Sequence, residues 1–285
     1  MAERIGIMLA YPFSEKYFNK FIGTPIIQPK LDGVRARAIL NAGGIIGDVQ
    51  LLSSSARNIQ APIIIDRLKH LALKFGSSIE LDGELWSPEM TFEEVNSLTS
   101  RTVNIIEDDR LNMYIFDAVS EELRQVHRLE LMSSISGMIA DSDLSLVEFH
   151  SCQSYKDVLA QTDAYQKSGY EGAVVKDGVS FYIRKRSRSW LKLKPEHFDT
   201  YTIVDMLEEM DKYGNPKGSL GAFIVADADG NKFGVGSGLK AWQRIDYWYD
   251  HTLIGKQLKV KYHGLTAARK VPRHPVFVEV LNEAL

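Results

Sequence analysis

The stretch Gln28-Pro29-Lys30-Leu31-Asp32-Gly33-Val34-Arg35 restricts the fold and chemistry of this chain more than any other. Its Asp-Gly pair predicts a tight turn between two strands. A lysine beside such a turn can be a covalent nucleophile if its amine is neutral, which requires desolvation or nearby positive charge. Asp32 alone would stabilise the ammonium form, so a nucleophilic Lys30 needs other cations close by. The alternative is an ordinary strand end with a surface ion pair.

Candidate cations occur in Trp190-Leu191-Lys192-Leu193-Lys194. Side chains two residues apart in a strand point to the same face, so Lys192 and Lys194 are expected side by side. Two like charges repel unless an anion lies between them, and a triphosphate would fit there. The alternative is a strand that is solvated on one side.

Two strand-like segments place carboxylates beside glycines, Glu80-Leu81-Asp82-Gly83-Glu84-Leu85-Trp86 and Glu171-Gly172-Ala173-Val174-Val175-Lys176. Each alone is an ordinary turn, but together they could bind ribose hydroxyls and an oxygen-seeking Mg²⁺. Tyr114-Ile115-Phe116-Asp117 supplies an aromatic ring that could stack on a base, although core packing is the commoner role of a strand phenylalanine. No P-loop motif is present, so an ATP site here must be of another kind.

Composition adds broad limits. The chain has 285 residues, a formal net charge of −3 and one cysteine, Cys152, which excludes an intrachain disulfide and a zinc site built on several thiolates. Neither a signal peptide nor an apolar run of membrane-spanning length is visible. We therefore expect a soluble cytoplasmic protein that does not bind a membrane.

The order of apolar segments predicts two domains, residues 1–196 and 199–285, with a boundary near Glu196–Asp199. Strand-like and helix-like segments are mixed in the first domain, whereas the second has five short strands and one helix-like piece, Lys240–His251. Five strands in so short a segment suit a small Greek-key OB-fold barrel. The predicted strands are Ile26–Leu40, Ile79–Trp86, Leu111–Val119, Leu144–His150, Gly172–Lys176, Trp190–Lys194, Thr200–Leu207, Leu220–Ala226, Lys232–Val235, Gln257–Tyr262 and Val276–Val280. The predicted helices of the first domain are Ile65–Phe75, Thr91–Leu98, Glu121–Ile139 and Ser154–Lys167.

The motifs above, together with Ser55-Ala56-Arg57-Asn58, resemble in order and separation the nucleotidyltransferase motifs of the ATP-dependent DNA ligases. The second domain is similar to the OB-fold domain of compact phage-type and viral ligases. The resemblance runs from about Pro25 onward. It implies an α+β fold, in which an adenylation domain of antiparallel sheets with flanking helices precedes an all-β OB-fold domain.

The resemblance also implies roles. Lys30 would attack the α-phosphate of ATP and carry AMP, which then passes to the 5′-phosphate of nicked double-stranded DNA before the 3′-OH attacks. Glu84 would hold the ribose, Phe116 would stack on adenine, and Lys192 and Lys194 would hold phosphates and act in catalysis. The other implied nucleotide contacts are Gln28, Arg35, Arg57 and Glu171, and the implied ligands of Mg²⁺ (or Mn²⁺) are Asp32, Glu84 and Glu171.

Two runs without acidic residues, Phe181–Lys194 and Gln257–Pro275, are predicted to contact DNA phosphates, so that a monomer closes around the nick. Short basic runs are otherwise solvated faces. The expected DNA-binding residues are Arg184, Lys185, Arg186, Arg188, Lys259, Lys261, Arg269, Lys270 and Arg273.

The chain departs from the family at its end, Phe277–Leu285, where acids stand in place of a basic motif that orients pyrophosphate. We expect Arg269, Lys270 or Arg273 to take over part of that task. The alternatives left open are an mRNA capping guanylyltransferase, an RNA ligase and a non-catalytic nick-binding protein. An NAD-dependent ligase is disfavoured because one cysteine cannot form that family's zinc module.

Overall fold

The computed structural model describes residues 6–41, 48–140, 144–194, 196–266 and 269–281. The chain divides into two compact units, Met1–Lys194 and Pro195–Leu285, and each is described here by itself. The expected boundary near 196–199 lies a few residues after this division. Within the described residues, no helix is long and apolar enough to span a membrane.

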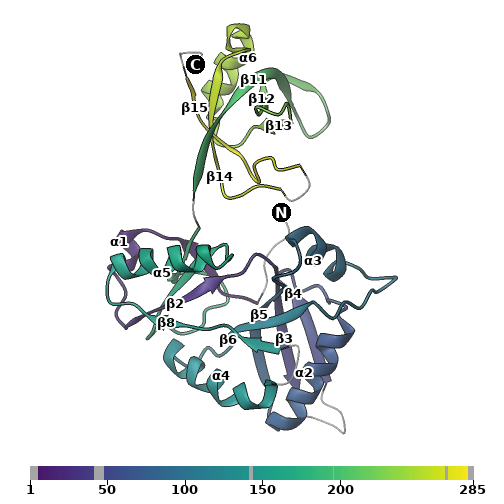
Figure 1. Ribbon diagram of the computed structural model, residues 1–285, viewed down its shortest axis with the longest axis vertical. Coiled ribbons are helices and arrows are strands. Elements are labelled where there is room, and N and C mark those ends of the chain that lie inside the picture. Colours follow the sequence, from purple (N-terminus) through teal and green to yellow (C-terminus); the bar gives the residue numbers. More distant parts are fainter. Residues whose placement is uncertain (1–5, 42–47, 141–143, 195, 267–268, 282–285) are drawn as a thin grey trace. The chain divides into compact units, whose positions relative to one another are not determined.

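One five-stranded sheet of the first unit carries the larger hydrophobic core. Its strand order is β4-β3-β5-β6-β7, and helices α2 and α4 pack on one face (Figure 1). That face is apolar because every second residue of the central strands is hydrophobic, as with Ala36, Ala38, Leu81 and Leu85, all fully buried. The opposite face presents charged and polar side chains. The bounds are β3 Val34–Asn41, β4 Asp48–Ser53, β5 Ile79–Trp86, β6 Asn112–Ala118, β7 Leu144–Leu146, α2 Pro62–Phe75, α3 Phe92–Thr99 and α4 Gln125–Ile139.

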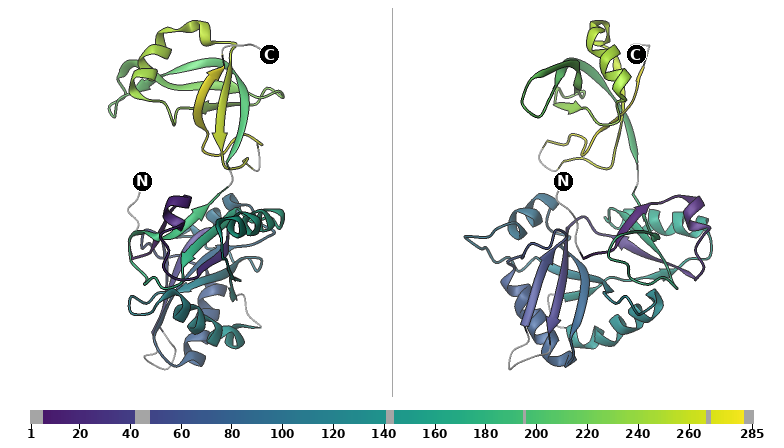
Figure 2. Two further views of the ribbon diagram at one scale, coloured as in Figure 1. Left: turned by 90° about the vertical axis from the view of Figure 1, so that its left-hand side faces the viewer. Right: turned by 180° about the vertical axis from the view of Figure 1, so that it is seen from behind.

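The second sheet of the first unit has the order β1-β10-β9-β2-β8, and α5 packs on it (Figure 2). Its core joins residues of β2, β9, β10 and α5, among them Ile27, Val175, Leu191 and Val158. The bounds are β1 Leu9–Pro12, α1 Glu15–Phe18, β2 Pro25–Lys30, β8 His150–Ser151, α5 Tyr155–Lys167, β9 Gly172–Asp177 and β10 Arg186–Leu193. Both sheets of this unit are mixed, because β1 pairs with β10, and β6 with β7, in parallel.

The second unit is one curled sheet of order β13-β12-β11-β14-β15 with α6 beside it. All its ladders are antiparallel, and its core includes Ile203, Phe223 and Val260. In its described residues a single bridge, Ser237 to Val276, joins the two edge strands, so the expected barrel is not closed. The bounds are β11 His197–Met210, β12 Pro216–Ala226, β13 Lys232–Val235, α6 Ala241–Tyr249, η1 His251–Leu253, β14 Gln257–Tyr262 and β15 Val276–Leu281.

Most predicted elements are confirmed, including the capping box that begins α3 at Thr91. The prediction of one strand over Ile26–Leu40 is wrong, because the chain turns between β2 and β3. At that turn a Cβ on Gly33 would lie 2.2 Å from the Leu85 carbonyl oxygen, so only glycine allows the turn to approach β5. The short elements β1, α1 and β4 were not predicted.

Candidate active site

Strand register places the predicted lysines on one face of the sheet that contains β2. Gln28 pairs with Val174, which pairs on its other side with Lys192, so Gln28 and Lys192 lie in one row across three strands. Lys30 pairs with Gly172 two rows further on, so its side chain points to the same face. A Cβ on Gly172 would lie 2.2 Å from the Leu193 carbonyl oxygen, so glycine is required where β9 passes the end of β10. The row arrangement brings side chains far apart in sequence to one surface.

Lys30, Glu171 and Lys194 form one ionic cluster at the edge of this surface. The Lys30 Nζ lies 2.5 Å from Glu171 Oε2, and the Lys194 ammonium donates to Glu171 Oε1. The three side chains keep 23%, 12% and 25% of their surface exposed, respectively. Burial alone would raise the pKa of Glu171, but the two lysines lower it below its ordinary value. A strongly charged, solvent-accessible cluster therefore surrounds the predicted nucleophile.

Glu84 lies on the polar face of β5, in a row with Arg35 of β3 and Tyr114 of β6. Burial raises the pKa of the Glu84 carboxyl to about 7, although the charges of Lys30 and Arg35 act in the opposite direction. A carboxyl that is half ionised near neutral pH can accept a hydrogen bond from a hydroxyl or bind a cation.

Arg35 is held by Asp82, a residue to which the sequence assigned no role. Its Nε and Nη2 donate to the two Asp82 oxygens at 2.9 and 2.5 Å, and the Tyr182 hydroxyl also donates to Asp82 at 2.5 Å. The guanidinium carbon lies 5.1 Å from the centre of the Phe116 ring. Arg35 is therefore oriented by a buried carboxylate, with part of its guanidinium left for a ligand.

Phe116, expected to stack on adenine, is half-buried and lies edge-on to Trp190. The Lys176 ammonium lies 4.2 Å from the Trp190 ring centre and 5.2 Å from that of Phe116. Lys176 ends the motif Glu171–Lys176, but the sequence indicated no role for it. Burial lowers its pKa to about 8, although Asp117 favours the charged form.

A second ionic cluster lies behind these rings. Asp117 accepts from Arg128 Nε at 2.8 Å and from Lys176 Nζ at 3.2 Å. All three side chains are essentially inaccessible to solvent. Arg128 also donates to the Gln125 side-chain oxygen, which accepts from the Trp190 indole as well. This cluster holds the rings of Phe116 and Trp190 in position.

Gln28 is buried, and neither its amide nitrogen nor its amide oxygen has a hydrogen-bond partner among the described residues. A buried amide without partners is costly unless a ligand satisfies it. The free donor and acceptor lie on the Lys30 face, because Gln28 and Lys30 are two residues apart in β2.

The three predicted metal ligands do not form a ready-made site. Within the residues that the structure describes, no three His, Cys, Asp or Glu side chains are close enough together to hold a metal ion. Glu171 forms ion pairs with two lysines, Lys30 and Lys194. The assignment of Asp32, Glu84 and Glu171 as metal ligands therefore stays a prediction.

The run Phe181–Lys194 has acids nearby in space, although it has none in sequence. Arg184 donates to both oxygens of Glu80 at 2.9 and 2.8 Å and to Glu121 at 2.7 Å. Its guanidinium is occupied by these carboxylates, so Arg184 would have to exchange them for a phosphate to bind DNA, and its DNA contact stays a prediction. In contrast, Arg186 and Arg188 are exposed and have no ion pair among the described residues. Lys185 is also exposed.

In the second unit, two of the predicted lysines have acidic partners: Lys259 lies 3.1 Å from Glu279, and Lys261 lies 3.0 Å from Glu196. Both pairs are on the surface, where such pairs contribute little and exchange easily. Arg269 and Lys270 are exposed, and Arg269 donates to the Lys232 carbonyl. Arg273 is half-buried beside them in sequence.

Arg57 lies on the turn after β4, where Ala56 has a positive φ of 58°. The turn is closed by the Ser53 amide, which donates to the Arg57 carbonyl at 2.8 Å. The exposed Arg57 guanidinium donates weakly to the Ser100 carbonyl at 3.3 Å, so it can readily change partner.

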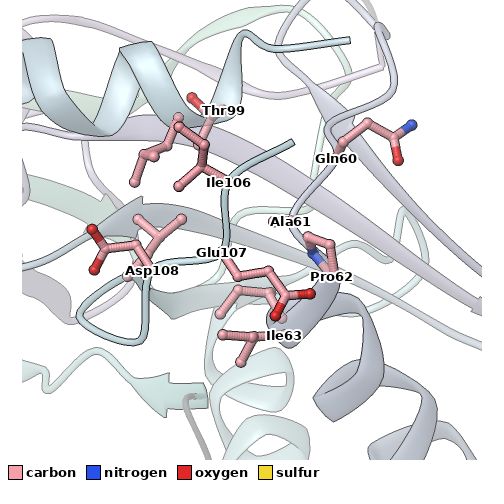
Figure 3. A pocket seen from close by; sticks show the side chains of 11 residues that line it. Gln60, Ala61, Pro62, Ile63, Thr99, Ile106, Glu107 and Asp108 are labelled. Carbon is pink, nitrogen blue, oxygen red and sulfur yellow. The ribbon is translucent and has the colours of Figure 1, made fainter. Parts of the chain in front are cut away.

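Figure 3 shows a separate hollow between the start of α2 and the end of α3, lined by Thr99, Ile106 and Asp108 among others. Its cavity volume is about 10 Å³, which is room for one water at most. It contains none of the predicted site residues and is not a nucleotide site.

The first unit has two mixed sheets whose lysines and carboxylates form the site, and an OB-like unit follows it. This arrangement is that of nucleotidyltransferases, in which an adenylation domain precedes an OB domain. The family model described as "ATP dependent DNA ligase domain" matches residues 7–194, and that described as "DNA ligase OB-like domain" matches residues 213–280. The chain therefore belongs to the ATP-dependent DNA ligase family. It is an enzyme that seals nicks in DNA with ATP, as expected from the sequence.

Individual relatives agree with this assignment. A DNA ligase of Haemophilus influenzae is 26% identical over 267 residues, with 92% of this chain and 88% of the relative covered. A DNA ligase of African swine fever virus is 27% identical, and this chain spans 66% of its length. Among solved structures, one of the Lig E DNA ligases has a TM-score of 0.78 at 21% identity, covering 97% of this chain and 99% of that one. The Chlorella virus DNA ligase-adenylate has a TM-score of 0.55 at 22% identity, covering 99% of this chain and 100% of that one.

Proposed function

We propose that Lys30 is the residue that carries AMP during nick sealing. The observation that carries this proposal is the position of its Nζ, 2.5 Å from Glu171 in an accessible cluster that also contains Lys194. Phosphoryl transfer depends mainly on positioning and on neutralising negative charge. Strand β2 supplies the position, and Lys192 of β10 and Lys194 directly after it supply the charge.

The first step forms a bond between the Lys30 nitrogen and the α-phosphorus of ATP and breaks the bond from that phosphorus to the bridging oxygen, so that pyrophosphate leaves. The amine must lose a proton, and Glu171 is the nearest carboxylate that can accept it. Lys192 and Lys194 neutralise the phosphate oxygens, which draws Lys194 away from Glu171. Lys192 also supports the later transfer of AMP to the 5′-phosphate and the attack by the 3′-OH.

The nucleoside is held by groups from both sheets. Gln28 offers an unpaired donor and acceptor to the edge of the adenine base, and Phe116 offers a ring for stacking. Glu84 accepts hydrogen bonds from the ribose hydroxyls. Arg35 and Arg57 contact the sugar or the phosphate at the nick.

The carboxylates fit a metal that is bound partly by the substrate. Mg²⁺ in nucleotide enzymes is commonly held by one or two carboxylates together with phosphate oxygens. Glu84, whose pKa burial raises to about 7, and Glu171 would hold Mg²⁺ or Mn²⁺ in that manner, and Asp32, two residues after Lys30, is proposed as a further ligand. The metal would neutralise charge on the transferred phosphate.

We further propose that the protein acts as a cytoplasmic monomer whose two units both contact nicked duplex DNA. The contacts are sequence-independent and salt-sensitive, because they are made to phosphates. The proposed residues are Arg184, Lys185, Arg186, Arg188, Lys259, Lys261, Arg269, Lys270 and Arg273. Of these, Arg269, Lys270 and Arg273 are also proposed to assist self-adenylation by orienting pyrophosphate.

Nick sealing on defined substrates tests the proposal. We expect the purified protein with ATP and Mg²⁺ to seal a nick with DNA on both sides and to be inactive with GTP or NAD. A requirement for GTP would indicate a capping-type enzyme, and sealing only of RNA nicks would indicate an RNA ligase. Replacing Arg269, Lys270 and Arg273 together should slow self-adenylation; an unchanged rate would refute their role.

A further inference from the structure

A polar pocket at the edge of the β1–β10 sheet lies outside the residues assigned to the nucleotide. Its cavity volume is about 310 Å³, and its walls include the side chains of Lys20, Arg186, Arg188, Tyr11 and Tyr17. Residues of β1, of α1 and of the segment after α1 line one side, and residues of the start of β10 line the other.

An irregularity in the strand pairing creates this pocket. Ala10 pairs with Ser187, but the next residue, Tyr11, pairs with Leu191, so three residues of β10 have no partner in β1. The Ser187 hydroxyl accepts from the Ser189 amide at 3.2 Å. Bulges of this kind redirect side chains out of the strand pattern, and here the redirected side chain is Arg188.

Aromatic rings hold the two arginines in place. The Arg188 guanidinium carbon lies 5.2 Å from the Tyr11 ring centre and 4.8 Å from that of Tyr17, and the two rings meet edge-on. Arg186 lies over Tyr11 as well and donates to the Ala10 carbonyl at 2.6 Å. Stacking on a ring orients a guanidinium but uses none of its N–H donors. Among the described residues, no acceptor engages the side chain of Arg188.

The single carboxylate that lines the pocket forms no ion pair with these cations among the described residues. This carboxylate, Asp177, accepts backbone N–H groups from Ile22 at 3.1 Å, Gly23 at 2.9 Å and Val179 at 3.3 Å. Lys20, Arg186 and Arg188 form no ion pair among the described residues. Three cations, two of them with a fixed orientation, thus surround a space that is large enough for a phosphate group.

We infer that this pocket binds one backbone phosphate of the DNA beside the nick. A planar guanidinium with free N–H donors suits two phosphate oxygens, and a phosphodiester supplies both. This inference rests on the proposed function, and it assigns a specific subsite to Arg188 and Arg186. Arg188 precedes Lys192 by four residues, at most about 13 Å along a strand, which corresponds to about four base steps of DNA. The bound phosphate therefore lies within about four nucleotides of the nick.

Salt-dependent binding to a nicked duplex tests the inference. R188Q removes one charge from the pocket. R188K keeps the charge but loses the planar guanidinium and its paired N–H donors. The matched control is K156Q, which removes one charge from an exposed position on α5. We expect R188Q to weaken binding about fivefold to tenfold and to reduce the slope of log affinity against log salt by about one. R188K should keep the slope, and K156Q should behave as the wild type.

A scan with single uncharged methylphosphonates identifies the phosphate. One substitution within about four nucleotides of the nick should weaken the wild type several-fold and have no further effect on R188Q. The inference is overturned if R188Q matches K156Q in affinity and slope, or if every methylphosphonate affects R188Q and wild type equally. Thermal denaturation of R188Q and R188K checks that both variants are folded. Failure of the proposed function would instead appear in the wild type, as absent self-adenylation or absent binding to the nicked duplex.

Discussion

Two clusters in the first unit each join one carboxylate to two cations, and they differ mainly in access to solvent. Glu171 with Lys30 and Lys194 keeps 12–25% of each side chain exposed, whereas Asp117 with Arg128 and Lys176 is closed to solvent. An accessible cluster can exchange its internal partners for a substrate. A closed cluster cannot do so without leaving a buried charge unpaired, which is strongly unfavourable. The comparison assigns chemistry to the first cluster and support of the fold to the second.

Replacement of the nucleophile should have the largest effect. K30A should reduce ATP-dependent sealing by at least about 10⁴-fold, because no other group can accept AMP. The same variant should still seal a nick whose 5′-phosphate already carries AMP, because that step does not use the lysine as a nucleophile. Sealing assays on the two substrates provide the measurement. Equal loss on both would show that Lys30 acts otherwise than as the AMP carrier.

Disruption of the closed cluster should chiefly reduce stability. D117N leaves Arg128 and Lys176 as buried cations without a carboxylate, which should lower the free energy of unfolding by about 3–5 kcal/mol. Denaturant unfolding monitored by circular dichroism measures the change, with E171Q as the matched variant in the accessible cluster. A loss below about 1 kcal/mol in D117N would contradict the assignment of this cluster to the fold.

E171Q should show the opposite profile. Its loss of stability should stay below about 1 kcal/mol, because the cluster is partly exposed. Self-adenylation should slow about 100-fold, because the carboxylate that accepts the Lys30 proton is gone. Single-turnover formation of the AMP adduct measures this rate. If the variant adenylated itself at the wild-type rate, Glu171 would have no role in proton transfer.

Replacement of Glu84 should have the smallest effect, and it should appear in the pH profile of kcat/KM for ATP. With a pKa of about 7, the ionised fraction rises about tenfold between pH 6 and pH 8, so kcat/KM for ATP should rise by up to tenfold. E84Q should flatten this rise. The folded protein holds this proton more tightly than the unfolded chain, so the stabilisation is complete below about pH 4.5 and is lost as the pH rises through about 7. An unchanged pH profile in E84Q would remove Glu84 from ATP binding.

The sequence predicted the strands that carry the site better than the contacts between them. Lys30, Glu171 and Lys194 were each identified from local patterns, but their meeting depends on the strand order β10-β9-β2, which periodicity does not reveal. Tertiary contacts also explain why the ion pairs of Arg184 were not predicted, since Glu80 and Glu121 are distant in sequence. The ion pairs of Glu171 with Lys30 and Lys194 were not predicted either, because they depend on the same strand order.

Other features of the structure could not be predicted, because the nearby sequence has no strong pattern that indicates them. Tyr182 follows β9 in a segment without regular periodicity, yet its hydroxyl reaches the buried Asp82. Strands β1 and β4 are short, and β1 ends at Pro12, which disfavours a strand prediction. The bulge that redirects Arg188 arises from pairing with β1, so the alternating pattern of β10 alone could not indicate it.

Peptide mapping of the ATP-treated protein tests the central claim most directly, namely that the accessible cluster performs the chemistry and the closed one does not. After incubation with ATP and Mg²⁺ without DNA, mass spectrometry should find AMP on the peptide that contains Lys30, with none on Lys176 or Lys194. GTP should leave the chain unmodified. AMP on another lysine, or a GMP adduct at Lys30, would contradict the account.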